Sequence, residues 1–353
     1  MAVQERSTEA FVEQVMGDLA ACYGGVMIST GHKLGLYRAL AGHGPMSSFE
    51  LAARAGCEER YVREWLNSQV AGGYLAYHDE SETYELPAEH VPVLVDEASP
   101  LFMPPAFEIP ASMWFDQEST LDAFRTGAGI PWGDHDDRLY CGISAIYGNF
   151  YRASLVPEWL PALDGVVEKL QRGALVADVG CGYGYSTLLM ASAFEQSRFI
   201  GIDTHAPSLE EARANAESAG VGARVDFQRA DAKSYPAAGG YDLICFFDCL
   251  HDLGDPVGAA RHAFESLADD GTLMVVEPFA GDTVSDNLGP IGRLYYTGST
   301  NLCVPHSRSE EVGLALGAQA GPARLAAVFE EAGFGSIRTA YETPFNIVLE
   351  VRR

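Results

Sequence analysis

The chain has 353 residues, of which 47% are hydrophobic and 20% are charged. This composition excludes extended disorder, and the length is sufficient for one large domain with a smaller partner. The formal net charge of -26 repels phosphate backbones and counts against nucleic acid as a partner.

No targeting segment is expected at the N-terminus. The first ten residues include Glu5, Arg6 and Glu9 and contain no apolar run, whereas a signal peptide or a membrane span needs a continuous apolar stretch. We therefore expect a cytoplasmic chain that does not enter a membrane. The seven cysteines have no paired C-x-x-C spacing, which favours reduced thiols and predicts neither disulfides nor a bound metal.

The N-terminal part has helical periodicity. Apolar residues recur near helical spacing over residues 8 to about 42, and we expect two helices there, broken near Gly24 and Gly25. Ser47 and Glu50 have the spacing of a capping box, which predicts the start of a short helix that ends at Gly56. The chain therefore opens on an all-α segment.

A further helix and two short strands follow. The helix is expected over about residues 58–71, with Tyr61, Trp65 and Val70 directed inward. Strands over roughly residues 74–78 and 83–86 are joined by a polar turn. Two short helices followed by a strand pair make a winged helix, so residues 1–97 are expected to form a winged-helix domain.

Charge argues against DNA as the partner of this winged helix. Residues 1–100 contain 6 Lys plus Arg and 15 Asp plus Glu, a net charge of -9. Phosphate contacts need basic side chains on the reading helix, but the two arginines of the second helix stand among three glutamates. We therefore expect a dimerisation or packing domain and no nucleic-acid partner.

Residues 98–170 are rich in proline and aromatic residues and contain no repeat. We expect a connector of helices and irregular segments that covers the later site. Trp132 and His135 are candidates for closing that site, although a solitary histidine in a polar loop is more often solvated.

Strand and helix patterns alternate from residue 171 onward. Apolar runs predict strands over residues 175–179, 199–203, 224–227, 241–247, 272–276, 336–341 and 346–350. This alternation predicts an α/β fold with a doubly wound sheet, whose ligand lies beyond the carboxyl ends of the strands. Residues 171–353 are therefore the expected ligand-binding domain.

A glycine loop follows the first strand of this sheet. Asp178 is followed by Gly180, Gly182 and Gly184, which allow a tight turn and close approach to a ligand. A dinucleotide fingerprint would need a third glycine where Tyr185 stands, and no P-loop lysine follows. The Asp178 carboxylate would repel pyrophosphate and attract an ammonium or sulfonium group, which indicates a cationic cofactor. A tight turn without a ligand is the alternative.

Two further acids follow the next two strands. Asp203 ends the second strand, where a carboxylate can accept both hydroxyls of an adenosine ribose. Asp231, with Ala232 beside it, follows the third strand, where it could accept a hydrogen bond from an adenine amino group. A helix cap at Asp203 and a turn at Asp231 are the structural alternatives. Phe247, which ends the fourth strand, is expected to stack near adenine, and a packed strand residue is the alternative.

The loop from Asp178 to Gly184, with Asp203 and Asp231, closely resembles class I S-adenosylmethionine-dependent methyltransferases over about residue 175 to the C-terminus. Residues 1–100 resemble the winged-helix domain that precedes the catalytic domain in small-molecule O-methyltransferases and in a related bacterial and mycobacterial group. The resemblance implies a Rossmann-like seven-stranded sheet in the order 3-2-1-4-5-7-6, an antiparallel seventh strand, S-adenosylmethionine as cofactor, and a homodimer. It also implies that the loop glycines hold the methionine end, while Asp203 and Asp231 hold ribose and adenine.

His251 is the main candidate for a catalytic base. A histidine, with an ordinary pKa of about 6.5, can take a proton from a hydroxyl within hydrogen-bond reach. In plant-type O-methyltransferases a His-Asp pair lies nine residues after the aspartate of the fourth strand, and Asp242 and His251 have this spacing. A helix cap or a core position is the alternative for His251.

Neighbouring acids could position this base. Glu277, at the end of the fifth strand, matches a glutamate that brackets the histidine in those enzymes. A second bracketing glutamate would fall near Gln319, where this chain departs from the pattern. Asp252 and Asp248 could orient the acceptor or the base, or could cap the helix that starts near Pro256.

Residues 286–321 are expected to form a lid or an acceptor wall. The sequence therefore predicts a methyltransferase that uses S-adenosylmethionine to methylate a small molecule, aromatic or lipid-like, on oxygen, with His251 as the base. A winged-helix regulator that binds the cofactor without turnover is the alternative, and different chemistry on the same fold is a third.

Overall fold

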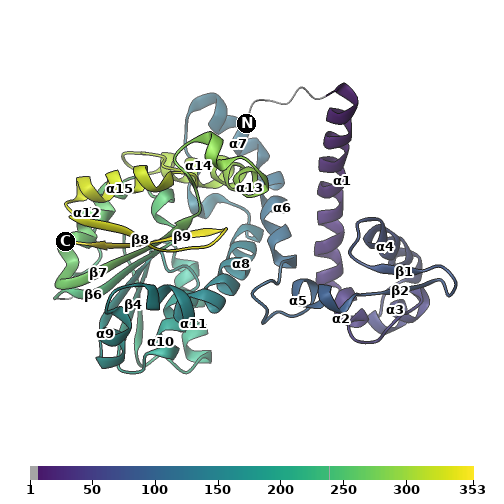
Figure 1. Ribbon diagram of the computed structural model, residues 1–353, viewed down its shortest axis with the longest axis horizontal. Coiled ribbons are helices and arrows are strands. Elements are labelled where there is room, and N and C mark those ends of the chain that lie inside the picture. Colours follow the sequence, from purple (N-terminus) through teal and green to yellow (C-terminus); the bar gives the residue numbers. More distant parts are fainter. Residues whose placement is uncertain (1–6, 238) are drawn as a thin grey trace. The chain divides into compact units, whose positions relative to one another are not determined.

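The computed structural model describes residues 7–237 and 239–353 and divides into two compact units (Figure 1). One unit contains Met1–Ser112 and Asp137–Asn149, and the other contains Met113–Asp136 and Phe150–Arg353. The expected connector over residues 98–170 is therefore divided between the units. In the described part of the chain, no helix is both long and apolar enough to span a bilayer.

The first helix is longer than the sequence suggested. α1 (Thr8–Lys33) runs without interruption, so the predicted break near Gly24 and Gly25 is wrong. A Cβ atom at Gly25 would lie 2.9 Å from Cδ1 of Phe107, so this glycine permits close packing and does not end the helix. The chain turns instead at Gly35, whose φ of 68° is left-handed, before α2 (Leu36–Leu40).

The elements of the winged helix are as predicted. α3 (Ser48–Ala55) begins at a capping box formed by Ser47 and Glu50, and it ends at Gly56 in the left-handed conformation. α4 (Glu59–Ala71) follows. β1 (Ala76–His78) then pairs antiparallel with β2 (Thr83–Glu85).

The inward face of α4 differs from the prediction at one residue. Trp65 is buried and Val70 is half-buried, but Tyr61 is 80% exposed, so its predicted inward position is wrong. The buried side of α4 consists of Val62, Trp65, Leu66 and Gln69. These positions follow helical spacing, and Tyr61 lies outside the stripe that they define.

Short helices lead from the winged helix to the sheet. They are η1 (Ala88–His90), α5 (Val91–Leu94), η2 (Pro104–Phe107), α6 (Glu108–Phe115), α7 (Gln117–Thr126), η3 (Trp132–Asp134), α8 (Arg138–Ser154), η4 (Leu155–Trp159), η5 (Leu160–Ala162) and α9 (Val166–Arg172). Proline occupies the first turn of α5, η2 and η5, where a missing backbone N–H costs no hydrogen bond.

The larger unit is built on a seven-stranded sheet. Its strands are β3 (Leu175–Val179), β4 (Arg198–Asp203), β5 (Val225–Arg229), β6 (Tyr241–Phe247), β7 (Leu267–Pro278), β8 (Ser336–Glu342) and β9 (Asn346–Arg352). The order β5-β4-β3-β6-β7-β9-β8 is 3-2-1-4-5-7-6 when these strands are counted along the chain. β9 is antiparallel to both neighbours. The predicted α/β fold with an N-terminal winged helix is therefore confirmed.

Helices cover both faces of this sheet (Figure 1). α10 (Tyr185–Ala193) and α11 (Ala206–Ser218) lie on one face, and α12 (Pro256–Ser266) and α15 (Gly321–Ala332) pack together on the other. The central strands are buried between these layers, which removes their apolar side chains from water. The carboxyl ends of β3, β4, β6 and β7 are thereby held at one edge of a rigid core.

The predicted lid segment is helical. After β7 come η7 (Val284–Asn287), α13 (Pro290–Gly298), η8 (Ser299–Cys303) and α14 (Val304–Ser309). η8 and α14 both contact η6 (Leu250–Asp252), the turn that follows β6. This segment therefore reaches the carboxyl edge of the sheet.

Candidate functional site

The glycine loop joins β3 to α10. Gly180, Gly182 and Gly184 have φ values of 76°, 52° and 78°, which side chains rarely adopt. A Cβ atom at Gly180 would lie 2.7 Å from Sγ of Cys249, and one at Gly184 would lie 2.9 Å from the Phe227 ring. A Cβ atom at Gly182 would meet nothing within 4 Å. Gly182 therefore marks the open side of the loop, where a ligand can approach the backbone.

The side chain of Asp178 is buried at the start of this loop. Its Oδ2 accepts hydrogen bonds from the hydroxyls of Ser186 at 2.6 Å and Thr187 at 2.5 Å. Its Oδ1 has no hydrogen-bond partner among the described residues. Burial, assisted by the charge of Asp203, raises the pKa of Asp178 to about 6 against these two hydrogen bonds. A buried acceptor without a donor fits a ligand that brings a cationic N–H group.

Asp203 is bonded to the backbone on two sides. Its Oδ2 accepts from the amide of Gly182 at 2.9 Å, and its Oδ1 accepts from the amide of His205 at 2.8 Å. Burial raises the pKa of Asp203, and these backbone hydrogen bonds partly offset the rise. Because His205 is the N-cap of α11, the helix-cap alternative is partly realised. An ionised carboxylate has about four acceptor positions, so it can still accept ligand hydroxyls.

The turn after β5 contains Asp231 and Ala232. Asp231 is exposed, and its Oδ1 accepts from the backbone amide of Lys233 at 2.7 Å, which is an Asx turn. Ala232 is buried. Phe247 ends β6 in a buried position, with its ring centroid 5.4 Å from that of Tyr151. The turn alternative for Asp231 is therefore realised.

A buried acid–base cluster follows β6. The imidazole Nδ1 of His251, on η6, lies 2.5 Å from Oε2 of Glu277 at the end of β7. The Nε2 atom lies 3.1 Å from Oδ1 of Asp252. Glu277 also accepts from the backbone amide of Leu250 at 3.1 Å. The structure thus brings the three predicted catalytic residues together.

The second carboxylate beside His251 does not lie near Gln319, where the resemblance would place a glutamate. The Gln319 amide donates to two backbone carbonyls, and Asp252 supplies the second carboxylate. Nor does Asp252 cap α12, because the N-cap is Asp255, which accepts from the amide of Gly258 at 2.8 Å. The histidine is therefore bracketed by one acid from the sheet and one from the adjacent position in the chain.

These carboxylates hold a proton on His251. Burial lowers the pKa of His251, but the charges of Asp252 and Glu277 outweigh burial and raise it well above the ordinary value. Burial raises the pKa of Asp252, and the charge of His251 more than reverses this effect. Near neutral pH the cluster is therefore an ion pair rather than a neutral imidazole beside an acid.

Asp248 lies at the same carboxyl edge of the sheet, where it joins β6 to other segments by hydrogen bonds. Its Oδ2 accepts from the hydroxyl of Tyr151 at 3.1 Å, and its Oδ1 accepts from the side-chain amide of Asn346 at 3.0 Å. Burial and the charge of Glu277 raise the pKa of Asp248 well above its usual value. With a φ of 51°, Asp248 forms a strained turn that ties η6 to the sheet.

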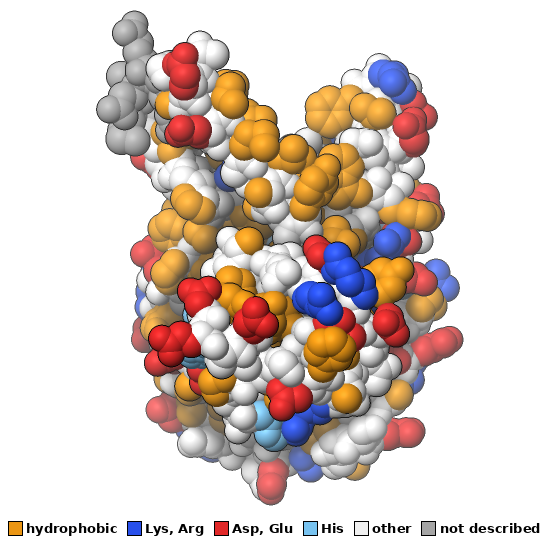
Figure 2. All heavy atoms as spheres, turned by 90° about the vertical axis from the view of Figure 1, so that its right-hand side faces the viewer, with side chains coloured by type: hydrophobic (Ala, Val, Ile, Leu, Met, Phe, Trp, Pro, Cys, Tyr) orange, Lys and Arg blue, Asp and Glu red, His pale blue; other side chains and the backbone are white. Residues whose placement is uncertain are grey.

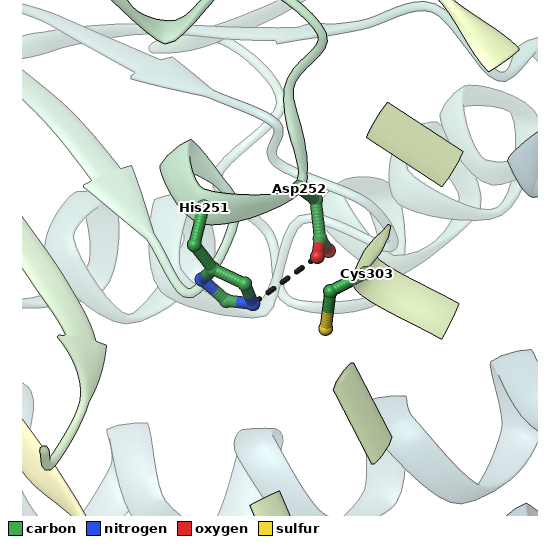
Figure 3. Close-up of side chains that lie close together, drawn as sticks. All are labelled: His251, Asp252 and Cys303. Atoms are coloured by element: carbon green, nitrogen blue, oxygen red, sulfur yellow. Dashed lines mark ion pairs between the residues drawn. The ribbon is translucent and has the colours of Figure 1, made fainter. Parts of the chain in front are cut away.

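Cys303 joins the cluster from a distant part of the chain. The ligand atoms of His251, Asp252 and Cys303 all lie within 4.8 Å of one another. Figure 3 shows the Asp252 and Cys303 side chains on the same side of the imidazole ring. Cys303 is not predicted from the sequence, because no short-range spacing links η8 to η6. Only the packing of η8 against η6 reveals the contact.

Trp132 and His135 have partners of their own. His135 is buried and its Nδ1 lies 3.1 Å from Oδ2 of Asp116, so the expectation of a solvated histidine is wrong. The backbone amide of Trp132 donates to Nδ1 of His306 at 3.2 Å, and the two rings lie 5.9 Å apart. This loop is therefore anchored to α14.

Family comparison identifies two modules in the chain. Residues 22–95 match the Rv2258c-like winged HTH domain, and residues 170–307 match a methyltransferase domain. The chain therefore contains a winged HTH domain followed by a methyltransferase domain, as the sequence resemblance implied.

Individual proteins are similar over different lengths. The trans-aconitate 2-methyltransferase of Streptomyces avermitilis is 34% identical over 115 residues, which are 33% of this chain and 43% of that protein. The chain spans less than half the length of the curated relatives it matches.

Solved structures are similar along the whole chain. The human N-acetylserotonin methyltransferase in complex with SAM has a TM-score of 0.72 at 17% identity, with coverage of 100% of this chain and 99% of that one. An O-methyltransferase family protein from Burkholderia thailandensis has a TM-score of 0.71 at 17% identity, with coverage of 99% and 98%. These likenesses show a shared fold.

Proposed function

We propose that this chain, a winged HTH domain followed by a methyltransferase domain, uses S-adenosylmethionine to methylate a hydroxyl group of a small molecule. The observation that carries the proposal is Oδ1 of Asp178, which is buried and has no partner among the described residues. It stands at the start of a loop that is open at Gly182. When bound, the cofactor supplies a methyl group on a cationic sulfonium and an ammonium group that can pair with Asp178.

The remaining cofactor contacts follow the strand ends. The backbone at Gly180, Gly182 and Gly184 holds the methionine end, because at Gly182 a ligand can approach without meeting a side chain. Asp203 accepts the ribose hydroxyls with the lone pairs that its two backbone bonds leave free. The residues proposed to contact the adenine are Asp231, Ala232 and Phe247. Burial raises the pKa values of Asp178 and Asp203, and a positively charged ligand would favour the ionised form of both carboxylates.

His251 is the proposed base. With the cofactor bound, Nε2 would accept the proton of the acceptor hydroxyl, while Glu277 would hold Nδ1 and fix the orientation of the ring. Asp252 stabilises the imidazolium that results. Because the pKa of His251 is raised, it is a strong base in the fraction of molecules in which Nε2 is unprotonated. The residues otherwise contribute by positioning the acceptor.

An aromatic or lipid-like acceptor is supported by apolar side chains near the cluster. Phe279 and Phe345 are 36% and 37% exposed and are joined by a backbone hydrogen bond of 2.8 Å. The Tyr295 hydroxyl donates to the carbonyl of Phe345 at 2.7 Å, and the charges of Asp248 and His251 act on Tyr295. We propose that this aromatic group contacts the acceptor.

The test combines a binding measurement with a search for turnover. Titration calorimetry should show binding of S-adenosylhomocysteine that is lost in Asp178→Ala. Incubation with labelled S-adenosylmethionine and a panel of phenols and hydroxylated lipids should give a labelled product that His251→Ala does not form. A chain that binds no cofactor would refute the proposal, and binding without turnover, together with cofactor-dependent DNA binding, would favour a regulator.

The winged HTH domain is proposed to form a homodimer. Both arginines of α4 are paired with glutamates, Arg60 with Glu64 at 2.6 Å and Arg63 with Glu59 at 2.7 Å, which leaves little positive charge for phosphate. α1 instead exposes apolar side chains along its length. Figure 2 shows hydrophobic side chains gathered along α1, at the upper left of that view. A second copy of α1 would cover this stripe.

A further inference from the structure

A second pair of an acid and a histidine, apart from the cluster at His251, has a nitrogen atom without a partner. Nδ1 of His135 lies 3.1 Å from Oδ2 of Asp116, which also accepts from the backbone amide of Asp136 at 3.1 Å. The His135 side chain is only 2% exposed, and its Nε2 is buried without a hydrogen-bond partner in the described part of the chain. A buried polar atom costs free energy until a water molecule or a ligand satisfies it.

The contact with Asp116 determines what this nitrogen can bind. A carboxylate oxygen only accepts hydrogen bonds, so the neutral imidazole of His135 carries its proton on Nδ1. Nε2 then has a lone pair and no proton. It therefore needs a donor such as a hydroxyl group, and an ether oxygen cannot satisfy it.

The loop that contains His135 is connected to the turn after β6. The backbone amide of Trp132 donates to Nδ1 of His306 at 3.2 Å. Nε2 of His306 lies 3.6 Å from Oε1 of Glu310, and Oε2 of Glu310 accepts from the amide of Gly254 at 2.7 Å. Gly254 follows η6, the turn that contains the proposed base, by two residues.

The same loop also approaches the strand end that is proposed to hold ribose. A Cβ atom at Gly133 would lie 3.8 Å from Cδ2 of His205. The backbone amide of His205 donates to Oδ1 of Asp203 at the end of β4. Residues 132–135 thus approach both the proposed base and the proposed cofactor site, and a methyl acceptor must be held between these two.

We propose that Nε2 of His135 accepts a hydrogen bond from a second hydroxyl group of the methyl acceptor, and so selects dihydroxy compounds over compounds with one hydroxyl. This role rests on the proposed function, which supplies the acceptor. The first hydroxyl reacts at His251, and His135 takes up no proton in the reaction. Because His135 is buried, water competes little for this hydrogen bond.

An aromatic ring beside His135 favours a flat acceptor. The centroid of the Trp132 ring lies 6.2 Å from that of His135 and 5.9 Å from that of His306. Such a ring offers an apolar surface next to the nitrogen. An aromatic diol therefore combines the two features that this part of the site can recognise.

Binding of matched ligands tests the preference on the full-length chain. Calorimetric titrations compare the two naphthols with dihydroxynaphthalenes that carry the second hydroxyl at different ring positions. At least one diol should bind about tenfold more tightly than either naphthol. The methoxynaphthol that corresponds to this diol can accept but cannot donate at the second oxygen, and it should bind no better than naphthol. Equal binding of diols and naphthols, or an equal gain from the methoxy group, overturns the proposal.

Variants assign the preference to His135. His135→Asn keeps a donor for Asp116 but lacks an atom at the position of Nε2, so it should lose the preference for the diol and bind naphthol as the wild type does. His135→Gln, whose side-chain oxygen can reach the position of Nε2, should regain part of the preference. His78→Asn, which removes a histidine paired with Glu85 at 2.9 Å on β1, should keep it. A preference that survives in His135→Asn with an unchanged circular dichroism spectrum overturns the role of His135.

Titrations with and without S-adenosylhomocysteine separate this role from methyl transfer. A chain that binds no S-adenosylhomocysteine would refute the proposed function, and the comparison of diol with naphthol would still decide the role of His135. Methylation of naphthols and diols with equal KM values would overturn the role of His135 and leave methyl transfer intact.

Discussion

The imidazole of His251 is held between two carboxylates, and its charge determines when it can act. Asp252 and Glu277 raise its pKa well above the ordinary value, although burial opposes them. A base must be unprotonated, so the active fraction grows as the pH rises through this elevated pKa. The spacing to Asp242 is sufficient to propose His251 as the base, but the charge state of His251 depends on contacts that only the fold provides.

The first prediction concerns the pH profile of methyl transfer. The rate at saturating substrate should rise with pH along a limb that lies above the usual histidine range. Asp252→Asn removes one negative charge, lowers the pKa of His251 and should move this limb to lower pH. Measurement of kcat from about pH 6 to 10 checks the shift. Asp226→Asn, an exposed acid on β5, should leave the profile in place, and an unmoved limb in Asp252→Asn would argue against the assignment.

The second prediction concerns the cost of keeping Asp178 buried. Its pKa is about 6 in the folded chain against an ordinary 3.8, so the folded state binds the proton more tightly. The stability from this group is complete below the ordinary pKa and is lost as the pH rises through about 6. The stability of Asp178→Asn relative to wild type should therefore increase by about 1 kcal/mol between pH 5 and 8.

Thermal unfolding at the two pH values, without cofactor, measures this difference. The amide can still accept from Ser186 and Thr187, so the variant should fold. Calorimetry at pH 8 should show that it binds S-adenosylmethionine at least about tenfold more weakly, because the charge that attracts the ammonium is gone. An equal difference in Tm at both pH values would show that Asp178 is not titrating in this range.

At the scale of elements, the strands of the sheet agree closely with the ranges predicted from the sequence, whereas the helices agree less well. The limits of β3 and β6 agree with the predicted ranges because continuous apolar runs bounded by polar residues define strands well. The predicted break in α1 failed because glycine serves two purposes, turning the chain and allowing close packing, and Gly25 serves the second. Cys303 was missed because its contact with η6 depends on tertiary packing alone.

The third prediction distinguishes a glycine that allows close packing from a glycine that leaves room for a ligand, within the same loop. Gly184→Ala would bring a Cβ atom to 2.9 Å from Phe227 at a φ of 78°, and should lower the free energy of unfolding by about 2–4 kcal/mol. Gly182→Ala enters open space at a φ of 52° and should cost only about 1–2 kcal/mol. Urea denaturation compares the two.

Cofactor affinity should show the opposite order. The added methyl group of Gly182→Ala lies on the open side of the loop, where it should weaken S-adenosylhomocysteine binding by about tenfold or more. A Gly182→Ala variant with wild-type affinity would mean that the ligand does not approach the loop there. Each variant serves as the control for the other, since both add a methyl group to the same loop.

At the scale of the whole molecule, the apolar stripe on α1 has the repeat of a coiled coil. Val12, Val15, Leu19, Cys22 and Val26 are exposed and follow one another at alternating intervals of three and four residues. This repeat is the a and d pattern of a two-stranded seam. The expected homodimer therefore has a specific candidate interface on α1, whereas the sequence alone predicts only that the winged-helix domain dimerises.

The fourth prediction tests this interface. Leu19→Asp places a charge in the seam and should convert the dimer to a monomer in light scattering coupled to size exclusion. Ala20→Asp, on the adjacent outward position of α1, should remain dimeric. Cys22 occupies a d position, so mild oxidation should link two chains if their helices are parallel. Wild-type chains that are monomeric at high concentration would refute the interface.

The division of the cluster between the sheet and the segment after β7 affects how this protein can change during evolution. Glu277 lies at the end of β7 and His251 on the short turn η6 after β6, close to the loop proposed to hold the cofactor, whereas Cys303 and Tyr295 belong to one continuous helical segment. Exchange of that segment would alter the proposed acceptor wall and the thiol beside His251 together, with the strand register unchanged. New acceptor preferences can therefore arise by replacing about twenty consecutive residues, a change that a single recombination event can supply.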